Sequence, residues 1–213
     1  MNIGILGSGA VGQELGMGFL EEGHSVMLGT RDTQKLKDWV IKAGENAYAG
    51  GFDDAARFGE LIVIATKWTG TENTINMAGR ENFSNKIVID VTNPLEMMQG
   101  AAPRISVSPG NSAAEQIQAW LPGAMVVKAF NTIGANLMCR PKLKEGLPDL
   151  FICGNDIEAK QAVAHFAEGW GWENITDMGD LSEAFYLEAL AALWVHYAFF
   201  NKSRTHAFKL LKK

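Results

Sequence analysis

Cysteine is scarce in this sequence: Cys139 and Cys153 stand far apart, with no C-x-x-C pattern and no histidine at ligand spacing. We therefore expect neither a metal site nor a disulfide, and two unbridged thiols fit a reducing cytoplasm. No uncharged apolar run reaches about 18 residues, so no membrane span is expected. The apolar N-terminal segment lacks a basic region and contains Gln13 and Glu14, which argues against a signal peptide.

Positive charge is also in short supply. The 213 residues hold 19 Lys and Arg against 24 Asp and Glu, a formal net charge of −5 that argues against nucleic-acid binding. A basic cluster near the C-terminus could meet anionic lipid or nucleic acid, but we interpret it as the solvated end of a helix. Its members are Lys202, Arg204, Lys209, Lys212 and Lys213. With 47% hydrophobic residues, the chain is typical of a globular protein with a sizeable core.

Short apolar runs alternate with helical patterns along the chain, and no internal repeat or low-complexity linker interrupts them. Such alternation predicts a doubly wound, mostly parallel sheet of the α/β class, with a small C-terminal α+β domain ending in a long helix. Strands are expected at residues 3–6, 24–29, 61–65, 87–91, 125–129, 150–153 and 174–176. Helices are expected at residues 10–22, 33–43, 71–79, 112–121 and 157–169, and a last helical stretch at 181–213, interrupted near Asn201. Residues 184–200 are apolar nearly all round apart from Glu188 and His196, so a second copy of the chain could cover this helix.

The first strand runs directly into a G-x-G-x-x-G pattern made by Gly7, Ser8, Gly9, Ala10, Val11 and Gly12. Gly7 allows a tight turn, Gly9 lets the backbone approach a pyrophosphate, and Gly12 permits close packing of helix on strand. Because the pattern follows a strand and opens a helix, it predicts a dinucleotide site with the pyrophosphate on the helix N-terminus.

The end of the second strand predicts which dinucleotide binds. An Asp or Glu there usually takes the ribose hydroxyls of NAD, but this chain has Thr30 and Arg31, with Lys35 shortly after. These three residues offer hydrogen bonds and positive charge to a 2′-phosphate, which favours NADP(H). Asp32 lies one or two residues late and is expected to cap the helix that begins at Thr33.

Three further apolar strands end in small or polar residues that we expect at the same sheet edge. Asn93 and Thr132 suit a carboxamide or a phosphate, and Pro94 and Gly134 are expected to fix the backbone. Trp68 could form a wall beside a nicotinamide, although packing is an equally good interpretation. The candidates from these segments are Thr66, Lys67, Trp68, Asn93, Pro94, Asn131, Thr132, Ile133 and Ala135.

No catalytic nucleophile and base are predicted, because the four histidines are scattered. We expect His24 at a solvated strand start, His165 within a helix, His206 in the basic tail, and His196 as a satisfied core histidine. Hydride transfer between two bound cofactors needs close stacking and exclusion of water rather than a protein acid or base.

Several segments resemble the F420-dependent NADP reductase family. They are GILGSGAVG (4–12), the GTR and Lys35 of residues 29–35, IATKW (64–68), DVTNPL (90–95), VKAFNTIGA (127–135), ICGND (152–156), DMGDL (177–181) and LEALAALW (187–194). The resemblance covers essentially the whole chain, and the cytosolic domains of membrane ferric reductases share a related pattern. It implies a Rossmann domain at residues 1–135, a small C-terminal domain at residues 136–213, a homodimer, and hydride transfer between NADPH and coenzyme F420 as co-substrate.

The resemblance also implies roles for individual residues. The Ser8–Val11 segment would hold the pyrophosphate, and Thr30, Arg31 and Lys35 the 2′-phosphate. Thr66, Asn93 and Ala135 would line the nicotinamide side, with Ile133 against the ring where the deazaflavin stacks.

The acceptor stays open at this point, because the sequence departs from archaeal members at residues 91–94 and at Lys67, which border it. A flavin, a quinone or a ferric chelate could replace F420. A β-hydroxyacid or imine reductase is disfavoured because about 80 residues after Asn131 are few for its helical substrate domain. An NADP-binding sensor without turnover is a further alternative.

Overall fold

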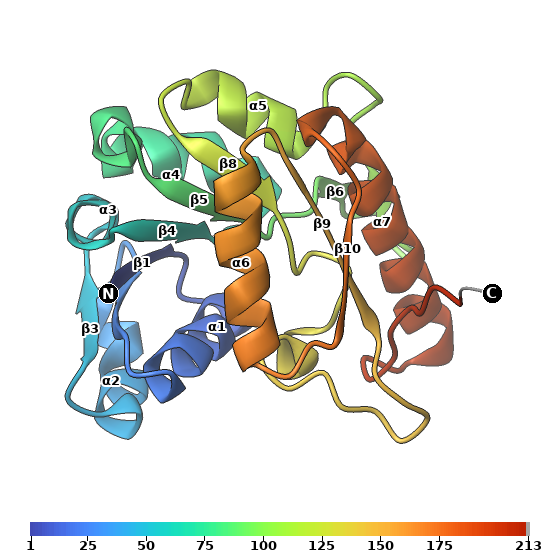
Figure 1. Ribbon diagram of the computed structural model, residues 1–213, viewed down its shortest axis with the longest axis horizontal. Helices are drawn as coiled ribbons and strands as arrows, with labels where there is room; N and C mark the ends of the chain where they lie inside the picture. The colour runs from blue at the N-terminus through green and yellow to red at the C-terminus, as the bar shows by residue number, and fades with distance from the viewer. Residues whose placement is uncertain (212–213) are drawn as a thin grey trace.

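One eight-stranded sheet forms the centre of the computed structural model, which describes residues 1–211 (Figure 1). The strand order is β10-β9-β8-β5-β4-β1-β2-β3, and neighbours run parallel except β8 and β9. The strands are β1 Asn2–Leu6, β2 Ser25–Gly29, β3 Ala47–Gly50, β4 Leu61–Ile64, β5 Ile87–Asp90, β8 Met125–Lys128, β9 Asp149–Gly154 and β10 Asn174–Asp177. A separate antiparallel pair joins β6 Leu95–Glu96 to β7 Arg104–Ile105. The predicted α/β class with a mostly parallel sheet is confirmed.

Side chains alternate between the two faces of the sheet and are buried on both. In β4, Leu61 and Val63 enter one hydrophobic core while Ile62 and Ile64 enter the other. Both faces are buried because helices cover both, which is the normal condition of a parallel sheet. This is why the strands read as continuous apolar runs rather than as alternating patterns.

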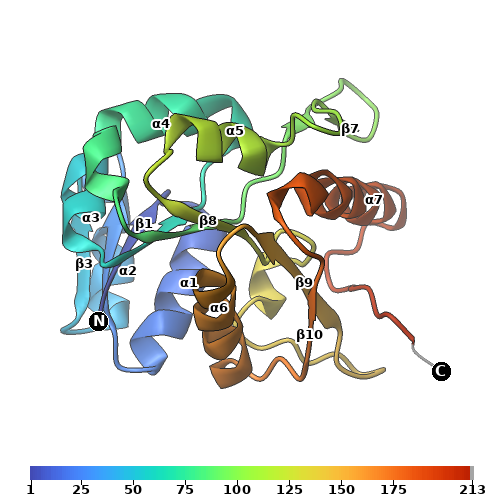
Figure 2. The same ribbon diagram turned by 45° about the horizontal axis from the view of Figure 1, so that its top comes forward.

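The helices form one layer on each face (Figure 2). The first core packs α1 Ala10–Glu21, α2 Lys37–Ala43 and α6 Ile157–Gly169 on the sheet. The second core packs α3 Phe52–Phe58, α4 Thr71–Ala78, α5 Ala113–Trp120 and the start of α7 Ala184–Asn201 on the opposite face. Short 3-10 turns, η1 Thr33–Leu36, η2 Trp68–Gly70, η3 Arg80–Phe83, η4 Ala135–Leu137 and η5 Leu181–Glu183, complete the chain.

The last helical stretch, expected over 181–213 with an interruption near Asn201, breaks there as predicted but does not resume among the described residues. The helix α7 ends at Asn201, since Lys202 adopts the left-handed conformation with φ of 50°. The following residues return along the molecule: Trp194 Nε1 donates to the His206 carbonyl at 2.8 Å, and the Asp149 N–H donates to the Phe208 carbonyl at 3.1 Å. The interpretation of the basic cluster as a helix end is therefore wrong for Arg204 and Lys209, while Lys212 and Lys213 lie outside the described residues.

Three strands, β3, β6 and β7, and one helix, α3, were not expected from the sequence. The second predicted helix, 33–43, is divided into the turn η1 and the helix α2. β9 and β10 extend the same sheet as β1–β5 and β8, and the division into domains at residue 135 stays a prediction. Among residues 1–211, no helix combines the length and apolar character needed to cross a bilayer.

Candidate functional site

A cleft of about 400 Å³ opens at the carboxyl ends of β1, β2 and β4. This is the point where the winding of the sheet changes direction, because β1 pairs with β2 on one side and with β4 on the other. Ligands of open parallel sheets bind at such switch points. Residues lining the cleft include Gly7, Ser8, Gly9, Thr30, Arg31, Asp32, Lys35, Phe52, Ala65, Thr66, Lys67, Thr69, Gly70, Asn73 and Thr74.

The turn between β1 and α1 requires glycine at two positions. Gly7 has φ of +132°, and a Cβ there would lie 2.4 Å from the Ala65 carbonyl oxygen. A Cβ on Gly12 would lie 2.2 Å from the Gly7 carbonyl oxygen, so the helix packs directly on the turn. Gly9 differs, because a Cβ there would meet nothing within 4 Å and would stand in open space.

The N-terminus of α1 is available to an anion. Gly9 is its N-cap residue, no side chain caps this end, and the first turn holds no acidic residue. Uncapped amides and the positive end of the helix dipole together form an anion site. Ser8 is held nearby, because its carbonyl accepts a hydrogen bond from Gln13 Nε2 at 2.8 Å.

The residues after β2 are arranged for a second anion. Thr30 Oγ1 accepts hydrogen bonds from Ser8 Oγ at 3.2 Å and from the Asp32 N–H at 3.3 Å, which leaves its own hydrogen free to donate. Arg31 is exposed at the cleft and takes part in no ion pair within residues 1–211. Lys35 Nζ lies 3.6 Å from Asp32 Oδ2 in an exposed ion pair, a weak interaction that a phosphate can replace.

Asp32 caps the turn that follows it, as predicted. Its Oδ1 accepts a hydrogen bond from the Gln34 N–H at 3.1 Å. The cleft lining contains three basic side chains, those of Arg31, Lys35 and Lys67, and one acidic side chain, that of Asp32. This balance suits a ligand that carries several phosphate charges.

Trp68 is placed differently from the other residues of its segment. Its ring stacks on Trp120, with centroids 5.6 Å apart and planes at 15°, and it does not line the cleft. Thr66 lines the cleft and its hydroxyl lies 2.8 Å from that of Thr71. The geometry therefore assigns Trp68 a packing contact, while Thr66 and Lys67 face the cleft.

The loops after β5 and β8 are joined by a pair of asparagines. Asn93 Nδ2 donates to the Asn131 carbonyl at 2.8 Å, and Asn131 Nδ2 donates to Asn93 Oδ1 at 3.0 Å. Two buried oxygens there, Thr92 Oγ1 and Asn131 Oδ1, have no hydrogen-bond partner among the described residues. Such oxygens are costly to leave unpaired, so this neighbourhood suits a ligand with N–H donors, such as a carboxamide.

The remaining candidates of this region are less accessible. Thr132 and Ile133 are buried, and Ile133 belongs to the first hydrophobic core. Ala135 begins the turn η4, and neither it nor Pro94 lines the cleft. The residue Gly134 lies under the C-terminal segment, since a Cβ there would be 2.9 Å from the Arg204 carbonyl oxygen. The roles of these residues at a nicotinamide stay predictions.

The histidines lie away from the cleft, and two expectations about them are wrong. His196 is exposed on α7 rather than buried in the core. His24 is half-buried, and its ring packs edge-on against that of Phe166, with the ring centroids 5.5 Å apart. His165 lies exposed on α6, as expected, and His206 stacks on Trp194.

Sequence reasoning missed a buried ion-pair cluster of Asp90, Lys128 and Glu188. The sequence offered two signs of this cluster: a charged residue ends each of two apolar strands, and a single acidic residue interrupts an apolar helix. It also missed Phe52, Asn73 and Thr74 in the cleft lining, because their helices are adjacent to it only in the folded sheet.

Comparison with known proteins agrees with this geometry. The family model described as NADP oxidoreductase coenzyme F420-dependent matches residues 2–94. The F420-dependent NADP reductase of Methanocaldococcus jannaschii is 29% identical, covering 92% of this chain and 91% of that protein. A crystal structure of a candidate F420-dependent NADP reductase from Arthrobacter sp. FB24 is 32% identical over the whole of both chains, with a TM-score of 0.93. The chain belongs to the F420-dependent NADP reductase family.

A member of the F420-dependent NADP reductase family is an NADP-dependent oxidoreductase, and the residues of the cleft fit that cofactor. The open side of Gly9 and the uncapped helix suit a pyrophosphate, and Arg31 suits a 2′-phosphate. The chain is also 29% identical to the metalloreductase STEAP3 of Rattus norvegicus over 88% of its length, but it spans only 36% of that protein.

Proposed function

We propose that this protein transfers a hydride between NADP(H), bound in the cleft at the switch point, and a deazaflavin of the F420 type stacked on the nicotinamide. The observation that carries the proposal is the cleft itself. There, a helix N-terminus without a side-chain cap and an Arg31 without an ion-pair partner among residues 1–211 lie at the ends of neighbouring strands. A pyrophosphate and a 2′-phosphate on one dinucleotide would satisfy both.

In this arrangement the segment from Gly7 to Gly12 holds the pyrophosphate by its backbone amides, and Lys67 adds a further cation to the cleft lining. Thr30 and Arg31 donate hydrogen bonds to the 2′-phosphate, and Lys35 adds a charge. Two charge-assisted bonds at about 1.5–3 kcal/mol each favour NADP over NAD by roughly a hundredfold or more.

The nicotinamide end is proposed to lie toward the loops after β4, β5 and β8. Thr66, Asn93 and the segment from Asn131 to Ala135 would orient the ring there, and the unpaired Asn131 Oδ1 supports an amide-bearing ligand. Once bound, NADPH supplies the hydride from its nicotinamide ring. The protein's part is to bind, to orient and to exclude water, which is why no acid or base is needed at the reacting carbon.

The choice of F420 as acceptor is supported by the names of the relatives from Methanocaldococcus jannaschii and Arthrobacter. The likeness to the STEAP3 metalloreductase favours a second candidate, reduction of a flavin or a ferric chelate. A cytoplasmic location and the lack of a nucleic-acid partner stay predictions.

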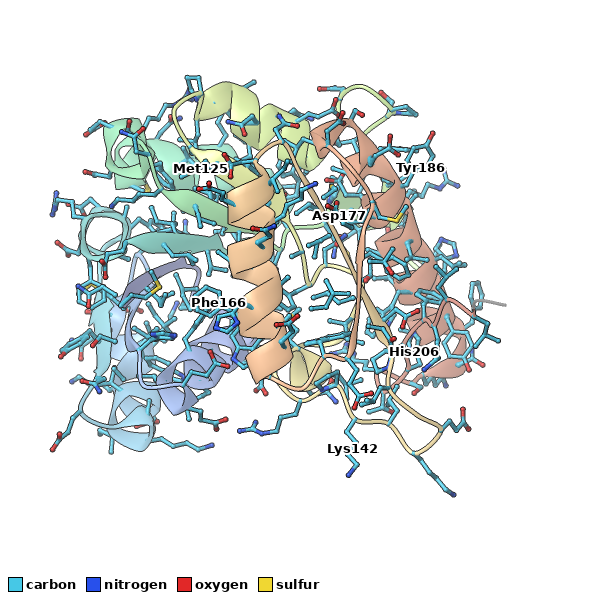
Figure 3. All side chains as sticks on the ribbon, in the orientation of Figure 1. Met125, Lys142, Phe166, Asp177, Tyr186 and His206 are labelled. Carbon is cyan, nitrogen blue, oxygen red and sulfur yellow. The ribbon has the colours of Figure 1, made fainter. Side chains whose placement is uncertain are left out.

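A homodimer through α7 belongs to the same proposal. Large apolar side chains are exposed along this helix, including Leu193 and Phe200, and Tyr186 points away from the body of the molecule (Figure 3). Exposed apolar surface of this kind is typical of a protein–protein interface. The C-terminal domain, residues 136–213, would then serve dimerisation and cover the acceptor.

Replacing Arg31 by Ala tests the cofactor assignment. We expect the dissociation constant of NADPH, measured by fluorescence titration, to rise about tenfold to a hundredfold, since one charge-assisted interaction is lost. Binding of NADH should change less than about threefold, because NADH lacks the 2′-phosphate. Lys42→Ala, which removes an exposed cation outside the cleft, is the matched control. Equal weakening of NADPH and NADH would refute the 2′-phosphate assignment.

The acceptor is tested by following NADPH oxidation with F420, FMN and a ferric chelate in parallel. Turnover with F420 alone would support the proposal. Turnover with FMN or the ferric chelate would favour the second candidate, and NADPH binding without turnover on any of them would favour a sensor.

A further inference from the structure

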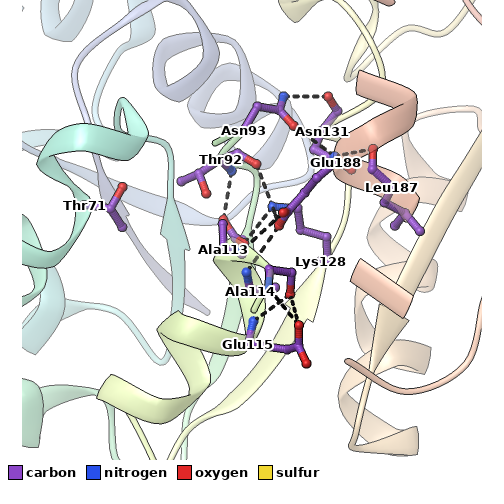
Figure 4. A network of polar contacts seen from close by, with 12 residues as sticks. Thr71, Thr92, Asn93, Ala113, Ala114, Glu115, Lys128, Asn131, Leu187 and Glu188 are labelled. Atoms are coloured by element: carbon purple, nitrogen blue, oxygen red, sulfur yellow. Dashed lines mark hydrogen bonds and ion pairs between the residues drawn. The ribbon is translucent and has the colours of Figure 1, made fainter. Parts of the chain in front are cut away.

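Three charged side chains outside the cleft are completely buried together (Figure 4). Asp90 ends β5, Lys128 ends β8 beside it, and Glu188 comes from α7. Lys128 Nζ lies 2.9 Å from Asp90 Oδ2 and 2.9 Å from Glu188 Oε1. We call these residues the strand-end charge cluster.

Every polar group of the strand-end charge cluster has a partner. The third donor of the Lys128 ammonium goes to the Thr92 carbonyl at 2.6 Å, and Asp90 Oδ1 accepts from the Thr92 N–H at 2.8 Å. Glu188 accepts from the backbone N–H groups of Ala113 and Ala114 at 3.1 and 3.3 Å, in the first turn of α5. The second carboxylate is thus balanced by the positive end of a helix dipole.

Lys128 is charged in this setting. Burial by itself lowers the pKa of its ammonium, but the neighbouring carboxylates of Asp90 and Glu188 outweigh that effect and raise the pKa above its ordinary value. The cluster is therefore a fully paired ionic network at neutral pH.

Stability alone does not account for such a network. Replacing a buried ion pair by apolar residues of similar volume is often neutral or stabilising. The neighbouring strand β4 has an apolar residue in the same register, since Ile64 pairs with Asp90. Charged residues at this level of the sheet must therefore serve another purpose, and holding the neighbouring loops in position is one that they can serve.

The cluster positions the loops after β5 and β8. Thr92 is held at both its N–H and its carbonyl, which places Asn93 directly after it. The partner of Asn93 is Asn131, and Asn131 Nδ2 also donates to the carbonyl of Leu187 at 3.0 Å. Leu187 and Glu188 are adjacent, so one turn of α7 holds both loops at the sheet edge.

We propose that the strand-end charge cluster is a positioning device for the nicotinamide side of the site, acting through Thr92 and Asn131. This inference rests on the proposed function, because it takes Asn93 and the segment after Asn131 to orient the nicotinamide. Asp90, Lys128 and Glu188 are positioning residues: they touch the loops and not the cofactor cleft.

The test compares Glu188 and Glu115, two carboxylates that accept hydrogen bonds at the N-terminus of α5. Glu188→Gln keeps the size of the side chain but removes the charge that faces Lys128. Glu115→Gln is the matched control, because Glu115 accepts bonds from the Ser112 N–H and Oγ at the N-terminus of α5 without contacting Lys128. Both variants should lower the melting temperature slightly, because a neutral amide oxygen interacts less strongly than a carboxylate with the positive end of a helix.

Only Glu188→Gln should alter the nicotinamide. We expect its NADPH dissociation constant to stay within about threefold of wild type, because the phosphate cleft is intact. The fluorescence emission of bound NADPH should shift toward that of the free cofactor, and kcat should fall about tenfold to a hundredfold. The isotope effect with NADPH deuterated at the transferred position should rise, since hydride transfer becomes slower than the other steps.

Emission, kcat and isotope effect in Glu188→Gln equal to those of Glu115→Gln would overturn the inference and leave the proposed function standing. Wild-type protein that binds no NADPH would overturn the proposed function, and this inference with it. Asp90→Asn removes a charge from the other side of the cluster and supplies the same comparison if Glu188→Gln does not fold.

Discussion

Two glycines of the β1–α1 turn separate a requirement for folding from a requirement for binding. In Gly12→Ala, the new Cβ would lie 2.2 Å from the Gly7 carbonyl oxygen, a backbone atom that cannot rotate away. In Gly9→Ala, the new Cβ would meet nothing within 4 Å, and φ of −80° at Gly9 is ordinary for alanine. The same chemical change therefore has opposite consequences three residues apart.

Gly12→Ala must push α1 away from the turn by about 1 Å, and overpacking of this kind costs about 1–3 kcal/mol. Each kcal/mol lowers the melting temperature of a chain of this size by about 2–4 °C, so a fall of roughly 2–12 °C is expected. Gly9→Ala gains about 0.4–1 kcal/mol through the unfolded chain and loses a similar amount, roughly 0.5–1 kcal/mol, as a poorer N-cap. Its melting temperature should therefore stay within about 2 °C of wild type.

For NADPH affinity the order should be the reverse of that for stability, with Gly9→Ala affected strongly. The alanine methyl at residue 9 stands on the open side of the turn, where the pyrophosphate is proposed to lie, so Gly9→Ala should weaken NADPH at least about tenfold, or 1.4 kcal/mol. Thermal unfolding by circular dichroism and titration of NADPH fluorescence measure the two quantities on the same samples. Wild-type affinity in Gly9→Ala would refute the assigned pyrophosphate position, and wild-type stability in Gly12→Ala would refute the packing argument.

Two further outcomes follow from the packing of single side chains. Burial raises the pKa of both cysteine thiols, that of Cys153 to about 12, and both side chains are buried. At pH 8 the native protein should therefore react with a thiol reagent such as Ellman's only as fast as it unfolds, and rapid labelling of Cys139 or Cys153 would contradict their burial. Trp68→Phe and Trp120→Phe should each lower the melting temperature by a few degrees and leave NADPH affinity unchanged, because the two rings stack on each other. Loss of affinity in Trp68→Phe alone would instead place Trp68 at the cofactor, as its sequence context suggested.

Local signals in the sequence were enough for most of the elements. The helix α6 begins after the N-cap Asp156, whose carboxylate accepts from the Ala159 N–H, and it ends at Gly169 as predicted. The continuous apolar run at residues 61–64 indicated a strand buried on both faces. The glycine turn and Arg31 were also recognisable, since their residue types follow from the local backbone and charge that a dinucleotide requires.

Other features depended on contacts that no local pattern contains. The strand β3 has a weak sequence pattern and exists through its pairing with β2 at the sheet edge. The break of α7 at Asn201 was expected, but the course of the following segment was not: it is held by the stacking of His206 on Trp194. The tertiary contacts of this segment determine that the chain turns back along the molecule instead of resuming as a helix.

The sequence by itself determined the parallel α/β class, the dinucleotide turn and the preference expected at the end of β2, because each depends on residues close together in the chain. The tertiary structure decided which polar groups are buried in contact with one another. Asp90, Lys128 and Glu188 are far apart in sequence. Only the order of β5 and β8 and the return of α7 place both carboxylates 2.9 Å from the Lys128 ammonium. Burial of a charge is tolerated only when its partners are in place, so that network could be recognised only in the folded chain.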